Sequence, residues 1–405
     1  VAAGHTVHRE YYVNDGVNSE QMRLFAESVL ALRRGEPVPE NGYKGDYVSE
    51  IAAQIPAEHS VEEAQQLAQD LMIEAQRTAL TAFGTTFDTW FSEQSLHNRG
   101  MVSEEIEMLR AGQVADKEPV RNQLKLAKGG RWEDVEQEAQ DPTQETLWLR
   151  STKFGDDQDR VLQRRDGRLT YIASDVAYHK DKFNRPAEAN RLITILGPDH
   201  HGYIGRLHAV VAAMLLAEER VEWTSSDEPL TDLETKIYRS PDERARCKAA
   251  LALAQAKLEV HIYQLVRFLK DGKPAPMRKR DGNIFALIDL MREIGTHLRP
   301  ESSEAEQLEV GKDVARFFYL MRSHETTFDF DLDLAQRESD ENPVFYVQYA
   351  HARICSVIEK AAKEGLAPDK SKVDLLTHER ERDLVKILLD LPFEIQRIAA
   401  DYGVH

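Results

Sequence analysis

Three groups of side chains have types and spacings that could do chemistry. The first is a basic segment, the run from Pro276 to Arg280, with Gly272 and Gly282 near its two ends. Glycine lets the backbone bend sharply, Lys279 can reach two phosphates as a point charge, and arginines offer forked donors. The segment therefore suits a polyphosphate, although a run of charge is also typical of a solvated hairpin.

The second group is the Gly-Pro-Asp-His-His-Gly segment that starts at Gly197 and follows the aliphatic run 192–196. In open α/β sheets, ligands bind at the carboxyl ends of strands. A close backbone approach at Gly197, ribose hydroxyls on Asp199 and an imidazole donor from His200 or His201 would suit a nucleotide there. Paired histidines at a helix start can equally cap and pack, and the segment alone leaves both interpretations open.

The third group is acidic. Tyr171 and Asp175 are four residues apart and so share one face of a helix, and Glu93 ends the strand-like run 87–93. Two carboxylates and a phenol that converge would hold a cation, and a planar guanidinium can be gripped bidentately. An ordinary surface acid and a packed tyrosine are the alternative. An acidic pocket, a ribose site and a phosphate site, in this order along one chain, suggest ATP and a small cationic substrate.

The elements that must position these groups alternate between strands and helices. We expect strands at 5–13, 146–152, 159–165 and 192–196, and helices at 19–33, 60–83 and 203–217, the second opened by a Ser60/Glu63 capping box. This alternation predicts an α/β fold with a doubly wound, mainly parallel (Rossmann-like) sheet. Residues 101–145 and 218–241 lack a clear period and are interpreted as insertions.

The pattern becomes helical after Asp313. We expect helices at 313–322, 344–364 and 378–402, with Pro343 in the first turn of the second. These helices predict a separate all-α bundle domain after the α/β domain. No role follows for the stretch 296–309.

Composition limits the class of protein. The chain has 405 residues, with 41% hydrophobic and 30% charged residues, which is ordinary for a soluble protein of two or three domains. No apolar run is long enough to span a bilayer, and Cys247 and Cys355 match no metal spacing, so we expect a cytoplasmic protein without a bound metal. A net charge of -18 argues against indiscriminate nucleic-acid binding.

A series of ordered blocks resembles arginyl-tRNA synthetase of the bacterial type. The resemblance extends from the first residues to about Ala362 and is far more specific than any single motif. The blocks are Arg9–Asp15, Gly42–Val48, Phe87–Glu93, Ser151–Asp157, Tyr171–His179, Gly197–Tyr203 and Asn342–Arg353.

The resemblance implies a class I aminoacyl-tRNA synthetase. Such an enzyme activates L-arginine with ATP, with Mg²⁺ expected beside the nucleotide, and passes the arginyl group to tRNA(Arg). The residues that match the family's arginine-binding positions are Glu93, Tyr171 and Asp175. The residues that match its ATP-binding positions are Gly197, Asp199, His200, Met277, Lys279 and Arg280.

The resemblance also assigns a catalytic residue and a tRNA surface. Lys279 matches the signature-loop lysine that stabilises charge on the leaving phosphates, and Gln348, Tyr349, His351 and Arg353 match the start of the tRNA-reading helical domain. We expect a monomer. The implied divisions are 1–98 and 169–272 for the halves of the catalytic domain, 99–168 for a connective insertion, 273–340 for the signature loop and stem contacts, and 341–405 for the start of the anticodon-binding domain.

The chain departs from the family pattern in two places. Pro276 and Arg278 replace the usual lysine and serine of the signature loop, so Lys270 or Lys273 would have to supply the missing charge. The family's first signature, a histidine pair around a glycine, is absent, and we expect the sequence to be part of a longer enzyme. The alternatives are a catalytically inactive arginine- or tRNA-binding protein on the same scaffold, and a related nucleotidyl transferase that uses another amino acid.

Overall fold

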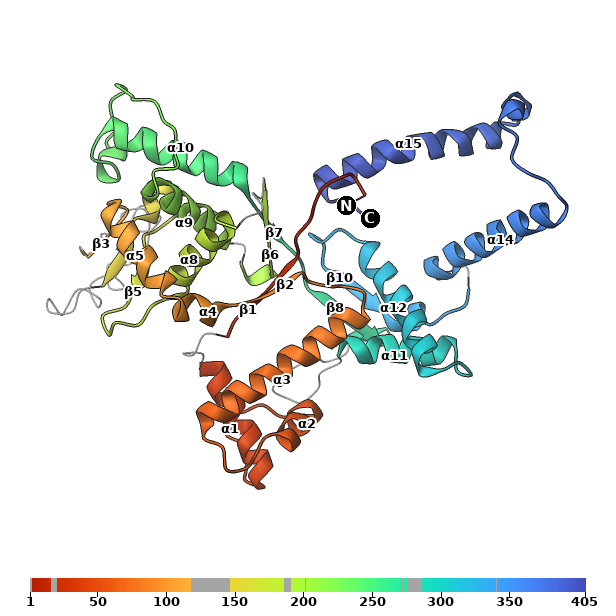
Figure 1. Cartoon of the computed structure of the whole chain (residues 1–405), viewed down its shortest axis with the longest axis horizontal. Helices are drawn as coiled ribbons and strands as arrows, with labels where there is room; N and C mark the ends of the chain where they lie inside the picture. The colour runs from red at the N-terminus through yellow and green to blue at the C-terminus, as the bar shows by residue number, and fades with distance from the viewer. Residues whose placement is uncertain are drawn as a thin grey trace. The chain divides into compact units, whose positions relative to one another are not determined.

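Helices and strands alternate along most of the chain (Figure 1). The computed structural model describes residues 2–15, 20–117, 146–185, 191–200, 202–270, 272–274, 286–339 and 341–405. Its contacts divide the chain into two units. The first unit comprises Val1–Tyr11, Asn18–Trp90 and Gln264–His405, and the second comprises Tyr12–Val17 and Phe91–Tyr263. The division falls inside strands β1 (Glu10–Val13) and β2 (Thr89–Ser92), which pair with each other.

The core of the second unit surrounds the part of helix α9 that starts at Ala209, which is apolar on all sides. In this part the residues Ala209 to Met214 are completely buried, as expected for a helical segment without a polar face. Helices α5, α8 and α10 pack against it. The helices of this unit are α4 (Glu93–Asn98), α5 (Met101–Ala111), α8 (Tyr171–Phe183), α9 (Tyr203–Ala217) and α10 (Pro241–Lys257), with short 3₁₀ turns η1 (Ser151–Phe154), η2 (Pro198–His200) and η3 (Glu234–Lys236).

The strands of the second unit form a parallel pair and an antiparallel sheet. Strands β6 (Leu192–Leu196) and β7 (Leu258–Ile262) are parallel, with Leu192 opposite Leu258. The β6 strand leads through η2 into α9, which puts the predicted nucleotide segment at the carboxyl end of a parallel strand. The antiparallel sheet contains β3 (Ala115–Asp116), β4 (Leu147–Leu149) and β5 (Arg160–Gln163).

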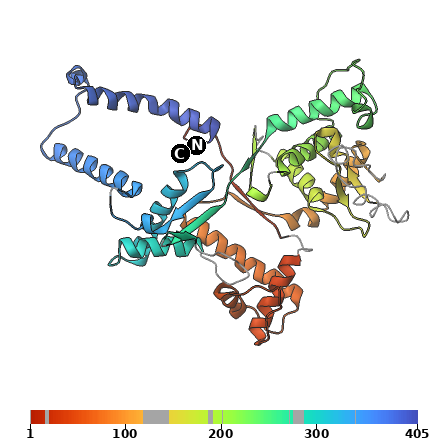
Figure 2. The same ribbon diagram turned by 180° about the vertical axis from the view of Figure 1, so that it is seen from behind.

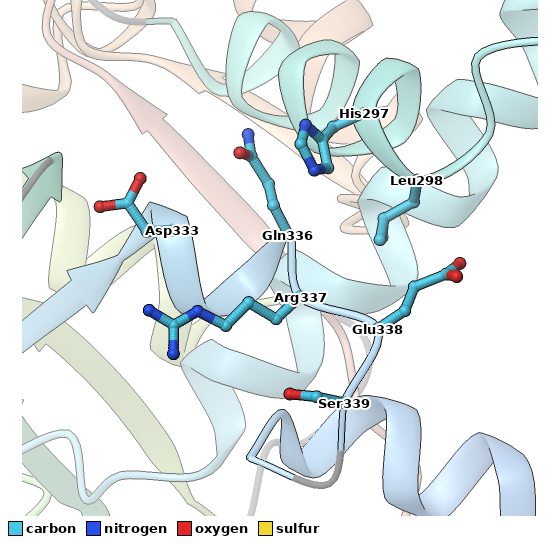
Figure 3. Close-up of a pocket in the computed structure, with 7 residues that line it drawn as sticks. All are labelled: His297, Leu298, Asp333, Gln336, Arg337, Glu338 and Ser339. Atoms are coloured by element: carbon cyan, nitrogen blue, oxygen red, sulfur yellow. The ribbon is translucent and has the colours of Figure 1, made fainter.

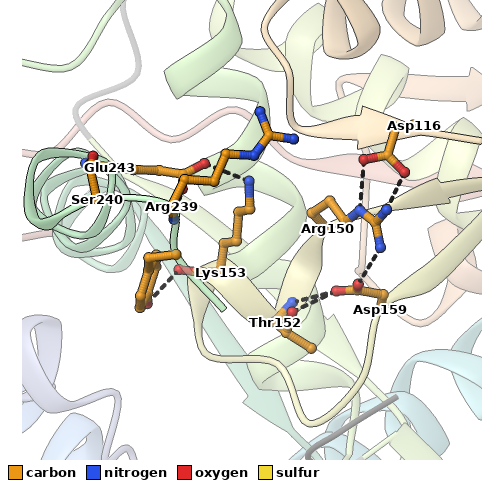
Figure 4. A network of polar contacts seen from close by, with 9 residues as sticks. Asp116, Arg150, Thr152, Lys153, Asp159, Arg239, Ser240 and Glu243 are labelled. Carbon is orange, nitrogen blue, oxygen red and sulfur yellow. Dashed lines mark hydrogen bonds and ion pairs between the residues drawn. The ribbon is translucent and has the colours of Figure 1, made fainter. Parts of the chain in front are cut away.

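A network of paired charges fixes the segment between β4 and β5 (Figure 4). Arg150 forms ion pairs with Asp116 and with Asp159, and its distance to the Asp159 carboxylate is 3.3 Å. The Nζ atom of Lys153 lies 2.6 Å from Oε1 of Glu243, at the start of α10. Arg150, Lys153 and Asp159 are largely buried, so the loss of one partner would leave a desolvated charge. The network therefore joins this hairpin to α10.

The first unit contains a three-helix cluster near its amino-terminal side, with α1, α2 and α3 side by side (Figures 1 and 2). Ser60 caps α3, since its Oγ accepts from the Glu63 backbone and the Glu63 carboxylate accepts from the Ser60 N–H at 2.9 Å. This confirms the predicted capping box. The helices are α1 (Glu20–Arg34), α2 (Asp46–Gln54) and α3 (Val61–Ala82).

A second cluster of the first unit combines two packed helices with a small sheet. The two helices, α11 and α12, approach so closely that a Cβ atom at Gly295 would lie 1.8 Å from the carbonyl oxygen of Gln307. Strand β8 lies between β10, which is parallel to it, and β9, which is antiparallel. The elements are β8 (Val266–Lys270), β9 (Lys273–Pro274), α11 (Leu287–Leu298), α12 (Glu304–Leu320), β10 (Phe328–Asp331) and α13 (Leu332–Ala335).

Two long helices end the chain, as the sequence predicts. Helix α14 (Pro343–Lys363) begins with Asn342 as its cap and proline in its first turn, and α15 (Glu379–Asp401) follows the 3₁₀ turn η5 (Lys370–Leu375). Many of their apolar side chains are exposed, including Val357 and Leu389. Among the described residues, no helix has both the length and the apolar character that crossing a bilayer requires.

Several expected elements differ from the structure. The strand predicted over 5–13 is formed only at Glu10–Val13, where β2 supplies a partner for its backbone. Residues 101–111 form helix α5 instead of an irregular insertion, because buried Val102, Ile106 and Leu109 recur at helical spacing among acidic residues.

The helix predicted over 313–322 begins earlier, at Glu304. A capping box between Ser303 and Glu306 starts it inside the stretch to which no role was given. The segment before the basic segment contains two strands, since β7 ends at Ile262 and β8 starts at Val266.

Candidate active site

Two acidic side chains of the second unit, Glu93 and Asp175, lie where three helices begin, and this cluster is called the acidic pocket below. Glu93 is the first residue of α4 and directly follows β2, Asp175 lies in the second turn of α8, and Tyr203 is the first residue of α9. Glu93 is buried, with 4% of its surface exposed, and Asp175 is partly buried. Because the N-terminus of a helix is polar, three helix starts in one region suit the assembly of a polar site.

Two tyrosine hydroxyls hold the carboxylates of this pocket. The hydroxyl of Tyr203 donates to Oδ2 of Asp175, and the hydroxyl of Tyr12, on β1, donates to the carboxylate of Glu93. Within the described residues, neither carboxylate forms an ion pair with a lysine, arginine or histidine. Buried carboxylates are normally paired with a cation. The pocket therefore has unused capacity for a positively charged group.

The electrostatics agree with that conclusion. The pKa of Asp175 is raised to about 6, chiefly by burial and also by the nearby charge of Glu93, while the Tyr203 hydrogen bond and the charges of Lys182 and Arg206 oppose the shift. Burial also raises the pKa of the Tyr12 phenol well above its usual range, with added effects from Glu93 and Asp175. A bound guanidinium would relieve the repulsion between the two acids.

Tyr171 lies away from the hydrogen bonds of this pocket. It shares α8 with Asp175, as predicted, but 67% of its surface is exposed. No side-chain hydrogen bond within the described residues joins Tyr171 to Glu93 or Asp175, and its role stays a prediction. Sequence reasoning did not select Tyr12 and Tyr203 as site residues. Both lie inside blocks that carry the family resemblance, and that position was the available signal.

The predicted nucleotide segment adjoins the acidic pocket through Tyr203. The ring of His200 meets the ring of Tyr203 edge-on at a centroid distance of 5.7 Å, and the N–H of His200 donates to the Gly197 carbonyl at 3.1 Å. Asp199 and His200 are exposed. A Cβ atom on Gly197 would meet only Tyr263 Oη, at 3.6 Å, and the ring carbon that bears it. The protein itself therefore leaves room beside this glycine.

The basic segment lies outside the described residues. Met277, Lys279 and Arg280 belong to the range 275–285, so their predicted roles remain predictions. Of the lysines considered as replacements for the missing one, Lys273 is exposed and pairs its backbone with Lys270 across β8 and β9.

The residues predicted to bind tRNA lie together on the exposed helix α14. Arg353 stacks over the Tyr349 ring at 5.7 Å and donates to its hydroxyl at 3.2 Å. The Nε2 atom of His351 lies 3.6 Å from Sγ of Cys355, and Gln348 is exposed. A cationic group over an aromatic ring can meet both phosphates and bases of a nucleic acid.

A separate groove in the first unit lies between the end of α11 and the segment after α13 (Figure 3). Its volume is about 590 Å³. The charged groups that line it have partners in the chain, since Arg337 pairs with Glu341 and Glu338 pairs with Arg299. The groove therefore offers mixed and already paired charges, and no predicted site residue lines it. The residues that line it are His297, Leu298, Asp333, Gln336, Arg337, Glu338 and Ser339.

No group of three or more potential metal ligands is found among the described residues. Two carboxylates at Glu93 and Asp175 do not match the oxygen-rich shell that a dedicated Mg²⁺ or Ca²⁺ site uses. The pocket thus fits an organic cation better than a metal ion.

Known proteins similar to this chain include arginyl-tRNA synthetases. The family model of the DALR anticodon binding domain matches residues 347–405. The chain is 35% identical to a curated arginine--tRNA ligase of Desulfosudis oleivorans over 98% of its own length and 60% of that protein. It therefore spans less than two thirds of this curated relative.

Solved structures give the same result. A Campylobacter jejuni structure described as a candidate arginyl-tRNA synthetase matches with a TM-score of 0.67 and 27% identity, over 99% of this chain and 73% of that one. The arginyl-tRNA synthetase of Thermus thermophilus matches with a TM-score of 0.63 and 19% identity, over 98% and 64% of the two chains. These likenesses confirm the predicted α/β fold class with a helical domain after it.

Proposed function

Because the chain belongs to the arginyl-tRNA synthetase family, we propose that the complete protein activates L-arginine with ATP and charges tRNA(Arg). The carboxylate of arginine attacks the α-phosphorus of ATP and pyrophosphate leaves. A hydroxyl of the terminal adenosine of the tRNA then attacks the arginyl-adenylate, and AMP leaves. The observation that carries the proposal is the pair of carboxylates, Glu93 and Asp175, that lack a cationic partner among the described residues.

In this proposal the acidic pocket binds the cationic groups of arginine. Glu93 and Asp175 are held by Tyr12 and Tyr203, so their oxygens are oriented before the substrate arrives. Preorganised acceptors of this kind bind a guanidinium at little cost in reorganisation. Tyr171 belongs to the pocket by the family resemblance and, being exposed on α8, would contact substrate from the solvent side.

ATP binds, in this proposal, across the segment after β6 and the basic segment. Asp199 and His200 are accessible for ribose contacts beside Gly197, where only the Tyr263 hydroxyl and its ring carbon come within 4 Å of the place a Cβ atom would take. Met277, Lys279 and Arg280 complete the nucleotide site, with Lys279 stabilising negative charge on the departing pyrophosphate together with Mg²⁺ brought by ATP. The loss of one such donor typically costs about 3 to 4 kcal/mol of barrier.

The helical end of the chain binds tRNA(Arg) in this proposal. An exposed polar and aromatic surface on α14, inside the segment 347–405 that matches an anticodon-binding domain, is formed by Gln348, Tyr349, His351 and Arg353. The range 341–405 is the start of that domain, and the enzyme acts as a cytoplasmic monomer.

The decisive experiment measures arginine-dependent exchange of pyrophosphate into ATP in the full-length gene product, with and without tRNA. We expect exchange that requires arginine and appears with tRNA present, since the family usually needs tRNA for this step. Arginine or tRNA binding without any exchange in a verified full-length chain would instead identify an inactive binding protein. Exchange driven by a different amino acid would contradict the proposed substrate.

A further inference from the structure

Tyr203 is contacted on several sides by groups of different charge. Its hydroxyl donates to Asp175, its ring meets His200 edge-on, and the guanidinium of Arg206 lies over its face, 4.8 Å from the ring centroid. Tyr203 and Arg206 are on the same helix, one turn apart, at the start of α9. One aromatic ring thus joins the acidic pocket, the nucleotide segment and a cation.

Arg206 is the member of this cluster that lacks a partner. Its Nε atom is buried and has no hydrogen-bond acceptor among the described residues. Within that part of the chain the guanidinium also forms no ion pair, and the nearby Asp175 oxygen Oδ2 accepts from Tyr203 instead. A buried arginine donor without an acceptor is costly, and such a group is expected to meet an anion when the site is filled.

We infer that Arg206 binds the carboxylate of the substrate amino acid and holds it where it meets the nucleotide. This inference rests on the proposed function. It makes Arg206 a specificity residue: the pocket selects a zwitterion that carries a guanidinium and a carboxylate, and rejects a guanidinium compound without the carboxylate.

The arrangement of charge supports this assignment. Glu93 and Asp175 provide the negative side of the pocket and suit the guanidinium and ammonium groups, so the carboxylate needs a separate positive group. Arg206 supplies that group across the width of one tyrosine ring from Asp175. His200, in the predicted ATP segment, contacts the same ring. A carboxylate on Arg206 would therefore lie between the arginine pocket and the nucleotide, where the reaction requires it.

The reaction also needs the carboxylate to remain a nucleophile. A guanidinium can bind one carboxylate oxygen through its forked donors and leave the other free to attack. The same cation is placed to stabilise negative charge that develops on the phosphate during attack.

The test compares L-arginine with agmatine, which is arginine without its carboxylate. Binding of each compound to the full-length gene product is measured by titration calorimetry, for the wild type and for Arg206→Gln. We expect Arg206→Gln to weaken arginine binding about 10- to 100-fold, the range of one charge-assisted hydrogen-bonded pair, and to leave agmatine binding nearly unchanged. Arg206→Lys, which keeps the charge, should retain part of the preference for arginine.

Arg246→Gln is a matched control. Arg246 also lies over an aromatic ring, that of Trp223 at 5.7 Å, but on α10. Arg246→Gln should change neither the affinity for L-arginine nor the affinity for agmatine. Equal loss of both ligands in Arg206→Gln, or loss of ATP binding with the preference for arginine intact, would overturn the inference and leave the proposed function standing. A wild-type protein that binds no arginine would overturn both.

Discussion

At the scale of single residues, the acidic pocket contains a carboxylate that destabilises the folded protein but remains available to bind a substrate. Asp175 is desolvated and sits near Glu93, and the result is a pKa raised to about 6. The Tyr203 hydrogen bond limits that cost without neutralising the charge. A buried acid that destabilises the folded protein and has no cationic partner among the described residues is typical of a binding site.

The stability of the protein should reveal this cost. We predict that Asp175→Asn raises the free energy of unfolding at pH 7.5 by an amount on the order of 1 kcal/mol, discounted because Asp175 is partly accessible. The folded pKa is above the unfolded value of 3.8, so folding favours the protonated form. The stabilising effect should therefore be small near pH 4, grow as the pH rises through about 6, and then remain constant.

Chemical denaturation of Asp175→Asn and wild type at several pH values measures this difference. Asp242→Asn is the control, since Asp242 is an acid whose pKa is lowered by hydrogen bonds from Ser225 and Ser226. That change should destabilise the protein at neutral pH, with the opposite sign. A pH-independent gain for Asp175→Asn would contradict the assignment. Asp175→Asn should also lower the affinity for arginine by at least about tenfold.

At the scale of elements, helix packing decides which glycines are required. Gly295 on α11 and Gly311 on α12 each face the other helix's backbone, with carbonyl oxygens 1.8 Å from where a Cβ would lie. Helix propensity alone favours alanine over glycine by about 1 kcal/mol in such positions. The close approach of the two backbones reverses that preference.

We predict that Gly295→Ala destabilises the first unit by more than about 2 kcal/mol, because the helices must separate to admit a methyl group. Equilibrium denaturation measures the loss. Gly205→Ala in α9 is the matched change in another helix, where nothing lies within 4 Å of the place that the added methyl group would take, and it should be neutral or stabilising. Similar effects of the two changes would refute the close packing of α11 and α12.

At the scale of the whole molecule, the two units have separate hydrophobic cores. Met214 lies in the core of the second unit and Leu290 in a core of the first, and both are fully buried helical residues. Each unit is made from segments that are discontinuous in sequence. Units of this kind can unfold as separate cooperative blocks.

We predict that calorimetric unfolding of the chain shows more than one transition. Met214→Ala and Leu290→Ala should each cost about 2 to 5 kcal/mol, and each should lower the temperature of a different transition. A single transition that both variants shift equally would show that the units unfold together.

Sequence patterns predicted those parts of the protein that depend on local interactions. The Ser60 capping box, the proline at the start of α14 and the strand–turn–helix around Gly197 are set by neighbours within a few residues. The sequence pattern did not predict helix α5, because its buried side is recognisable only when a core is present to cover it. The predicted start of α12 was too far along the chain, because the capping box at Ser303 lies among charged residues.

The candidate site divides in the same way. Residue types, order along the chain and family resemblance selected Glu93, Asp175, Asp199 and His200. Only the tertiary structure brought Tyr12 to Glu93 and Tyr203 to Asp175, because these pairs are joined by packing between β1, α4, α8 and α9. The contacts of Tyr203 with His200 and Arg206, in contrast, join residues that are three apart in sequence. The sequence alone determined which charges the protein carries, and the fold decided which of them remain without a partner, since pairing and desolvation depend on distance in space.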